Sequence, residues 1–186
     1  MTLLGRLLRN RRAGETHTAW NQPNLQGPEL LKLTSEGFGD CEAMPKAHGA
    51  KNIGGGNLSP QLSWSPPPPG TGQVLLVVED LDVPLPKPAV HCVALIDPAL
   101  ENLDTGALGA RQPTAGVRPL RSTIGRGYQG PSPIKGHGPH RYVFQLFALA
   151  SPVDVASVDK ARPHALLSSL TAPVLGRGRL TGTYER

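Results

Sequence analysis

The sequence contains little cysteine and no long apolar run. Its two cysteines, Cys41 and Cys92, are too few for the disulfide framework of a small secreted protein. No run approaches the roughly 20 apolar residues of a membrane-spanning helix. The N-terminus lacks the apolar core and small-residue cleavage site of a signal peptide. From these absences we expect a cytoplasmic protein with reduced cysteines and no transmembrane segment.

Aromatic residues are also scarce, at 4% of the chain, and the basic residues beyond Arg12 are scattered. A nucleic-acid surface usually combines a basic stripe with stacking rings, so we expect no nucleic-acid partner. The net charge of +5 and the isoelectric point near 9.6 nevertheless permit an anionic partner.

Glycine and proline are abundant, with 22 and 20 of the 186 residues. Without an internal repeat, this composition favours short elements joined by many turns and argues against a helical bundle. The length suits one domain with one good core.

Residues 1–29 differ from the rest and are interpreted as an N-terminal basic amphipathic arm, ahead of one domain over residues 30–186. One face of a helix there would carry four leucines with arginines around them: Leu3, Leu4, Leu7, Leu8, Arg6, Arg9, Arg11 and Arg12. One interpretation is a helix on a membrane surface or a partner protein. The other is an arm that is mobile or docked on the domain or on a second subunit, and the shortness of the segment favours it.

Continuous apolar runs at residues 74–78, 90–96 and 141–149 predict strands that are buried on both faces. Shorter strands are expected at residues 31–34, 61–64 and 179–184. Helical signals are confined to the C-terminal part, where Asp154 can cap one short helix and Pro163 can begin another. The pattern predicts a mainly β, β-rich α+β protein with a large antiparallel or mixed sheet and one or two late helices.

Polar side chains gather where the predicted buried strands begin and end. Asp80 and Asp82 follow the first strand, and His91 opens the second. The loop at residues 127–142, ahead of the third strand, holds two histidines, an arginine and two tyrosines; loops of this kind often carry function. Each segment also has a structural interpretation, as an Asp-rich turn, a packed histidine or an ordinary surface loop.

His137 and His140 are three residues apart, a separation found in metal sites. No cysteine pair or Glu–His motif accompanies them, and zinc needs three or four ligands, so we expect neither a metal nor another cofactor. The glycines at residues 54–56 lack the lysine of a phosphate-binding P-loop. A Gly-x-Ser-x-Gly serine elbow is also missing, and no catalytic residue is assigned.

Together, these segments resemble the phosphatidylethanolamine-binding protein family, and most closely its bacterial, Raf kinase inhibitor-like branch. The resemblance spans about residues 31–186, and it is specific because several weak motifs occur in the family's order. They are Asn-Leu-Ser-Pro-Gln-Leu-Ser-Trp at 57–64, Asp-Leu-Asp-Val-Pro at 80–84, His91, Tyr-Gln-Gly-Pro-Ser-Pro at 128–133, Lys-Gly at 135–136, His-Arg-Tyr at 140–142 and Gly-Thr-Tyr at 182–184.

The sequence departs from the family pattern at a few positions. Leu81 stands where the family has a proline, Ser132 and Ile134 replace a common cysteine and proline, and Cys92 replaces an aromatic residue after His91. These changes are expected to reshape the mouth of the pocket and its ligand preference.

The resemblance implies a fold with a large central sheet, a smaller sheet and a small pocket at one end, and the bacterial relatives imply a homodimer. Imidazole and backbone N–H groups and a tyrosine hydroxyl can donate to phosphate or carboxylate oxygens. Arg141 should face away from His140 along a strand and is interpreted as structural. By the same resemblance, the ligand-binding residues are Asp80, Asp82, His91, Gly130, Pro131, His140 and Tyr142.

The expected function is binding of a small anionic ligand or a phospholipid head group of the phosphate or phosphoethanolamine type. Modulation of an unidentified partner protein is an extension that the family's label implies. The alternative is an enzyme that uses the Asp/His cluster for acid–base chemistry on a small metabolite. The sequence contains no activated nucleophile and no cofactor fingerprint, which favours binding.

Overall fold

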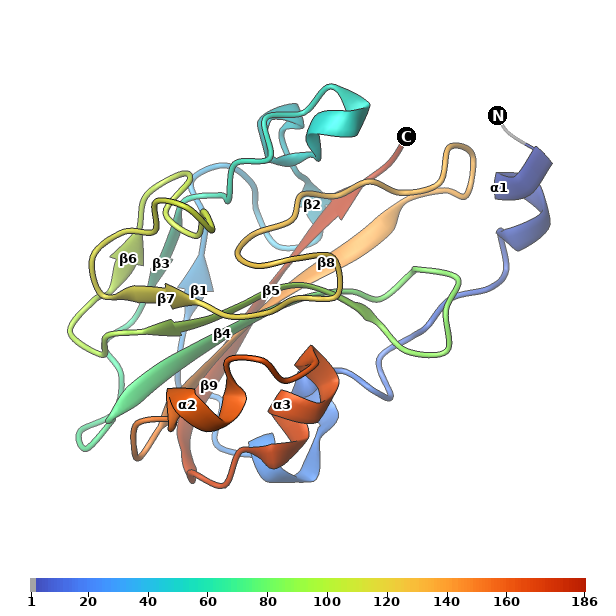
Figure 1. Cartoon of the computed structure of the whole chain (residues 1–186). Coiled ribbons are helices and arrows are strands. Elements are labelled where there is room, and N and C mark those ends of the chain that lie inside the picture. The colour runs from blue at the N-terminus through green and yellow to red at the C-terminus, as the bar shows by residue number, and fades with distance from the viewer. Residues whose placement is uncertain (1–2) are drawn as a thin grey trace.

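The computed structural model describes residues 3–186 and is dominated by β-strands (Figure 1). Met1 and Thr2 of the predicted arm, and the side chain of Leu4, lie outside the description. The strands are β1 (Leu33–Thr34), β2 (Glu42–Ala43), β3 (Leu62–Trp64), β4 (Gln73–Asp80), β5 (Ala89–Ile96), β6 (Asn102–Leu103), β7 (Val117–Pro119), β8 (His140–Leu149) and β9 (Val174–Tyr184).

Two sheets organise the fold. The large sheet has the order β2-β9-β8-β4-β5-β7 and is antiparallel except for the parallel pair β2–β9. The small sheet has the order β1-β3-β6 and is antiparallel. The apolar runs form the central strands β4, β5 and β8, which are buried on both faces, so the predicted β-rich fold is confirmed.

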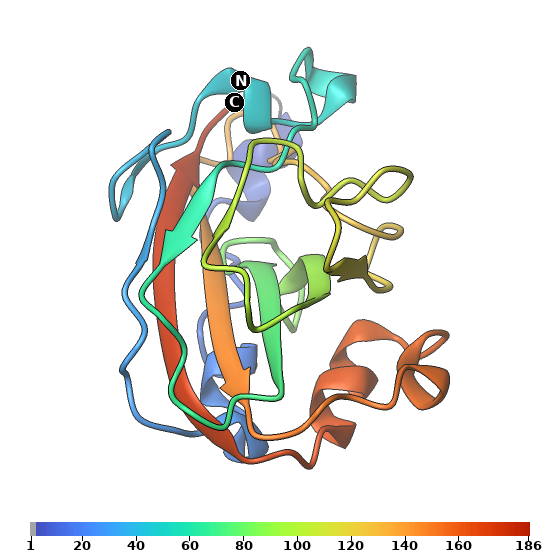
Figure 2. The same ribbon diagram turned by 90° about the vertical axis from the view of Figure 1, so that its left-hand side faces the viewer.

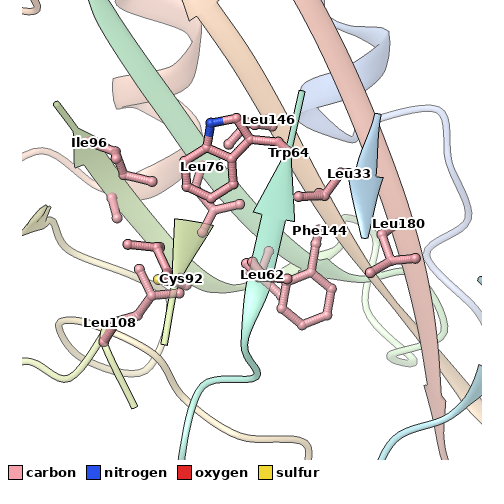
Figure 3. Close-up of a cluster of buried hydrophobic side chains, with 14 of the residues drawn as sticks. Leu33, Leu62, Trp64, Leu76, Cys92, Ile96, Leu108, Phe144, Leu146 and Leu180 are labelled. Carbon is pink, nitrogen blue, oxygen red and sulfur yellow. The ribbon is translucent and has the colours of Figure 1, made fainter. Parts of the chain in front are cut away.

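Each face of the large sheet covers its own core, because side chains alternate along every strand. The face toward the small sheet buries Leu76, Phe144 and Leu146 against Leu62 and Trp64 (Figure 3). The opposite face buries a second set of side chains under the C-terminal helices and the segment around residues 19–25. Burial of each such side chain contributes about 2 kcal/mol to stability.

The helices are short and begin where the sequence predicts. α2 (Val155–Val158) follows Asp154, whose carboxylate accepts a hydrogen bond from the Ala156 N–H at 3.1 Å. α3 (Pro163–Ser169) has proline in its first turn. Single 3-10 turns occur at η1 (Ala19–Asn21), η2 (Pro23–Leu25), η3 (Lys46–His48) and η4 (Lys51–Ile53).

The N-terminal arm packs on the domain. It contains α1 (Leu3–Leu8) and then runs along the loop after β4, where the Ala13 and Gly14 N–H groups donate to the carbonyls of Val83 and Leu81. In Figures 1 and 2, α1 and the end of β9 lie at the same end of the molecule. Within residues 3–186, every helix is too short or too polar to cross a bilayer.

β9 is longer than the sequence predicted, because it begins at Val174 rather than at residue 179. Its first half contains Gly176 and Gly178, which read as turn residues in a sequence. A Cβ at Gly178 would lie 2.0 Å from the Leu31 carbonyl oxygen, so the glycine permits the close approach of the chain before β1.

Candidate functional site

A polar cluster forms where β4 ends and β8 begins. Asp80 is the last residue of β4 and lies opposite Tyr142 on β8. His140 precedes Tyr142 by two residues, so both side chains occupy the same face of the sheet. Asp80, His140 and Tyr142 are 4%, 1% and 1% exposed, so the cluster is almost closed to solvent.

His91 reaches this cluster because of a β-bulge. Val78 pairs with Cys92 and Glu79 pairs with Val90, so His91 has no partner in β4. A bulge breaks strict alternation and re-aims a side chain. The His91 ring packs edge-on against Tyr142 with centroids 5.1 Å apart.

A chain of hydrogen bonds runs from Asp80 to the N-terminal arm. Asp80 Oδ2 lies 2.8 Å from His140 Nδ1, and His140 Nε2 lies 2.8 Å from His137 Nδ1. His137 Nε2 donates to the Leu8 carbonyl oxygen at 2.7 Å. Neither His137 nor Leu8 was predicted from the sequence to lie in the pocket. The spacing of His137 and His140 was the available signal, but it was considered only for metal binding.

The chain of hydrogen bonds orients both histidine rings. A carbonyl and a carboxylate only accept hydrogen bonds, so His140 Nδ1 donates to Asp80 and His137 Nε2 donates to the Leu8 carbonyl. The other nitrogen of each ring faces its neighbour, at 2.8 Å. The cluster is therefore held between the end of β4 and the N-terminal arm.

The Tyr142 hydroxyl is buried and has no hydrogen-bond partner of good geometry. Burial raises the pKa of Tyr142, and the charge and hydrogen bonding of the nearby Asp80 carboxylate raise it further, so the group stays protonated. A buried hydroxyl without a partner of good geometry is rare in a folded protein, which makes Tyr142 a candidate ligand contact.

His91 is held as one tautomer. Its Nδ1–H donates to the Gln129 carbonyl oxygen at 2.7 Å, which leaves the Nε2 lone pair free in the neutral ring. Burial lowers the pKa of His91, against the opposing effects of that hydrogen bond and of Asp80. The ring is therefore neutral at neutral pH and can gain a proton when an anion binds beside it.

The Asp82 side chain binds two arginines rather than a histidine of the cluster. Its carboxylate accepts from the Arg141 backbone N–H and forms a bidentate pair with the Arg141 guanidinium, while Arg12 lies 2.9 Å from Oδ1. Burial acts to raise the Asp82 pKa, but the hydrogen bonds from Arg141 and Arg12 outweigh it and hold the pKa at about 2. This carboxylate therefore fastens the arm and the start of β8.

Gly130 and Pro131 make their backbone hydrogen bonds to a neighbouring loop. The Gly130 N–H donates to the Asn57 side chain at 2.8 Å, and the Pro131 carbonyl accepts from Ala50. A Cβ at Gly130 would lie 2.4 Å from the His48 carbonyl oxygen, so glycine is required for the two loops to pack. These residues position Gln129, which orients His91.

Leu81, in place of the family's proline, extends the pairing of β4. Its N–H donates to the Arg141 carbonyl at 3.0 Å, a bond that proline cannot make, and its side chain is 2% exposed. Cys92 faces the core, where burial raises its pKa to about 12 and keeps the thiol protonated. Within residues 3–186, no group of three or more His, Cys, Asp or Glu side chains is arranged to hold a metal ion.

Comparison with known proteins identifies the family. Residues 34–185 match the family model of the phosphatidylethanolamine-binding proteins. The structure of E. coli YbcL, described as a member of the mammalian PEBP family, is similar with a TM-score of 0.73 and 28% identity, covering 84% of this chain and 98% of that one. A PEBP homologue from Chlamydia trachomatis has a TM-score of 0.70 and 27% identity, with coverages of 84% and 97%.

Curated sequences agree with this result. A UPF0098 protein of Mycobacterium tuberculosis is 32% identical over 169 residues, which cover 89% of this chain and 75% of that protein. The chain belongs to the phosphatidylethanolamine-binding protein family, as its motifs predicted. A pocket for a small anion is a general property of that family.

Proposed function

We propose that this protein binds a small anion of the phosphate type, either free or as the head group of a phospholipid, beside His91 and Tyr142. The observation that carries the proposal is the Tyr142 hydroxyl, which is buried beside the Asp80 carboxylate but makes no hydrogen bond of good geometry. A phosphate oxygen would accept from it, and burial without such a partner is unfavourable by about 1–3 kcal/mol.

The charges around this position support an anion. Asp80 alone would repel it, but the Asp80 carboxylate is hydrogen-bonded to the His140 ring at 2.8 Å. His91 is the nearest ring that can gain a positive charge. Burial lowers the pKa of His91, so the ring is neutral in the free protein. An anion that favours the protonated ring therefore causes His91 to take up a proton when the anion binds. Affinity should therefore rise as pH falls through the histidine range.

A phosphoethanolamine head group also fits the chemistry of the cluster. Its phosphate would accept from Tyr142 and His91, and its ammonium would be attracted to Asp80. The family's name, which refers to phosphatidylethanolamine, is consistent with this ligand class. Affinity should be weak, because the contacts are few and ordering a ligand is unfavourable.

The alternative function, acid–base catalysis, is supported by one observation. Asp80, His140 and His137 form a continuous path for a proton from the cluster to Leu8. Binding remains the better proposal, because the neutral His91 ring and the Tyr142 hydroxyl can contact a ligand without any reaction step.

Some expectations about the cellular setting belong to the same proposal. The free cysteines Cys41 and Cys92 support a reducing, cytoplasmic location. The homodimer implied by bacterial relatives and the modulation of a partner protein are proposals that rest on the family alone.

The test compares Tyr142→Phe with the wild-type chain by calorimetric or ³¹P NMR titration of phosphate and phosphoethanolamine. Removing a hydroxyl that makes no hydrogen bond of good geometry should leave thermal stability unchanged or slightly raised, while the affinity falls roughly tenfold. Tyr128→Phe is the matched control. Tyr128 is equally buried, but its hydroxyl donates to the His48 carbonyl at 3.2 Å, so this variant should lose stability and keep its affinity. Equal affinities in Tyr142→Phe and wild type would refute the proposal.

A further inference from the structure

α1 presents an apolar edge to solvent. Leu3 and Leu7 are 86% and 79% exposed, the highest values among the large apolar side chains that the structure describes. They are four residues apart and therefore lie on one face of the helix. Exposed leucines in a helix that has a folded domain beside it need an explanation.

The same segment is strongly basic. Residues 1–14 contain Arg6, Arg9, Arg11 and Arg12 and no acidic residue, and Glu15 is the first carboxylate of the chain. Arg9 and Arg11 are exposed, and their backbone N–H groups continue the helical turn by donating to the carbonyls of Arg6 and Leu8. Positive side chains thus follow the exposed leucines closely along the chain.

The arm is fastened to the domain in a way that keeps this edge outward. Gly5 is buried, and a Cβ there would lie 2.3 Å from the Lys135 carbonyl oxygen, so the backbone of α1 lies directly on the loop before β8. The Leu8 carbonyl accepts from His137, and Arg12 lies 2.9 Å from Asp82. These contacts hold α1 at the end of the molecule where β8 begins (Figure 1).

We propose that the exposed face of α1, with Arg9 and Arg11, docks on an anionic phospholipid bilayer. Leucines that flank arginines on a short helix can enter the head-group region while the guanidinium groups bind lipid phosphates. A second copy of this chain is a poorer occupant, because two basic arms and a net charge of +5 repel each other. This inference goes beyond the proposed function and does not depend on it.

The geometry also predicts how the docking behaves. One short helix with two exposed leucines gives weak, reversible binding, and arginine contacts with lipid phosphates are screened by salt. Binding should therefore need anionic lipid and should fall as ionic strength rises. Docking would bring the cluster around Asp80 close to the bilayer surface, since His137 links α1 to that cluster.

The experiment is flotation of the full-length chain with vesicles of phosphatidylcholine alone or with about one-third phosphatidylglycerol, at low and high salt. Wild type should float only with the anionic vesicles at low salt. Leu3→Asp/Leu7→Asp and Arg9→Glu/Arg11→Glu should each lose most of this binding. The control Leu30→Asp/Ile124→Asp changes apolar side chains that are 60% and 63% exposed elsewhere and should float like wild type.

Three outcomes would overturn the proposal. One is the absence of wild-type binding to anionic vesicles at low salt, and another is equal binding by the arm variants and the control. The third is a dimer in light scattering that only the leucine variant loses, which would identify a second copy as the occupant. Tyr142→Phe should still float, so failure of the anion site would leave this result unchanged.

Discussion

Glu79 is a buried carboxyl group that the binding cluster does not use. It lies on β4 next to the bulge that His91 makes in β5, and it faces away from Asp80, under the segment of η1. Its Oε2 accepts from the Ala19 N–H at 2.8 Å and from the Gln145 side chain at 2.7 Å, while Oε1 has no partner. Burial raises its pKa to about 7, although both hydrogen bonds act to lower it.

This shift makes the protein less stable at higher pH. The folded state binds a proton at Glu79 more tightly than the unfolded state, whose pKa is near 4.5. The stabilisation is complete below that value and is lost as pH rises through about 7. For Glu79→Gln, which stays neutral, the free energy of unfolding relative to wild type should rise by about 2–3 kcal/mol between pH ~5 and pH ~8.

Urea unfolding at both pH values measures this difference. The control Glu36→Gln changes an exposed carboxyl group and should follow the wild type at both. If the difference in the free energy of unfolding between Glu79→Gln and wild type were the same at both pH values, Glu79 would be ionised at both, against the prediction.

At the scale of residues, part of the cluster could be predicted. Asp80, His91 and His140 lie at strand ends and match family motifs, and the structure brings them together with Tyr142. The engagement of Asp82 with Arg141 and Arg12 could not be predicted, because Arg12 lies about 70 positions away, in a segment without a motif. The role of His137 depends on the position of the Leu8 carbonyl, which no sequence pattern encodes.

At the scale of elements, strands with strong apolar runs were predictable, and those defined by pairing were not. β4, β5 and β8 have side chains that need burial on both faces, which leaves a clear pattern. β2, β6 and β7 are only two or three residues long, and they exist because neighbouring strands supply partners. The bulge at His91 is also a property of pairing.

The packing of the loop at residues 127–142 gives an element-scale prediction. In Gly130→Ala, the new methyl group would meet the His48 carbonyl and the Ala50 N–H, which are backbone groups that cannot move aside easily. We expect a loss of about 1–3 kcal/mol in stability and a change in the His91 ring NMR signals. His91 responds because it donates to the Gln129 carbonyl, next to the substituted residue.

Thermal melts and ¹H–¹⁵N imidazole spectra test both expectations. Gly125→Ala, just before this loop, would place its methyl group against only the flexible end of Gln129, at 3.4 Å, and should change little. Gly130→Ala with wild-type stability and wild-type His91 signals would show that the two loops are not tightly coupled.

At the scale of the whole molecule, the arm and the domain behave as one unit. Deletion of residues 1–14 removes the Arg12–Asp82 ion pair, the Leu8–His137 hydrogen bond and the backbone bonds of Ala13 and Gly14. We expect a stability loss of about 2 kcal/mol, which lowers the melting temperature by roughly 4–8 °C in a protein of this size.

Differential scanning calorimetry measures the shift. Leu3→Asp/Leu7→Asp is the control, since both side chains are exposed and the fastening contacts remain. A truncated chain that melts with the wild type would show that the arm contributes no net stability. Light scattering on the same samples tests the homodimer, which stays a prediction.

The arm residues that make the fastening contacts lie outside the part of the chain that matches the family. The family match begins at residue 34, yet residues before that position supply partners to Glu79, Asp82 and His137. Relatives that share every motif of the cluster can therefore differ in the hydrogen bonds that hold its side chains in place. Divergence in a leading segment can change the surroundings of a pocket whose own motifs stay the same.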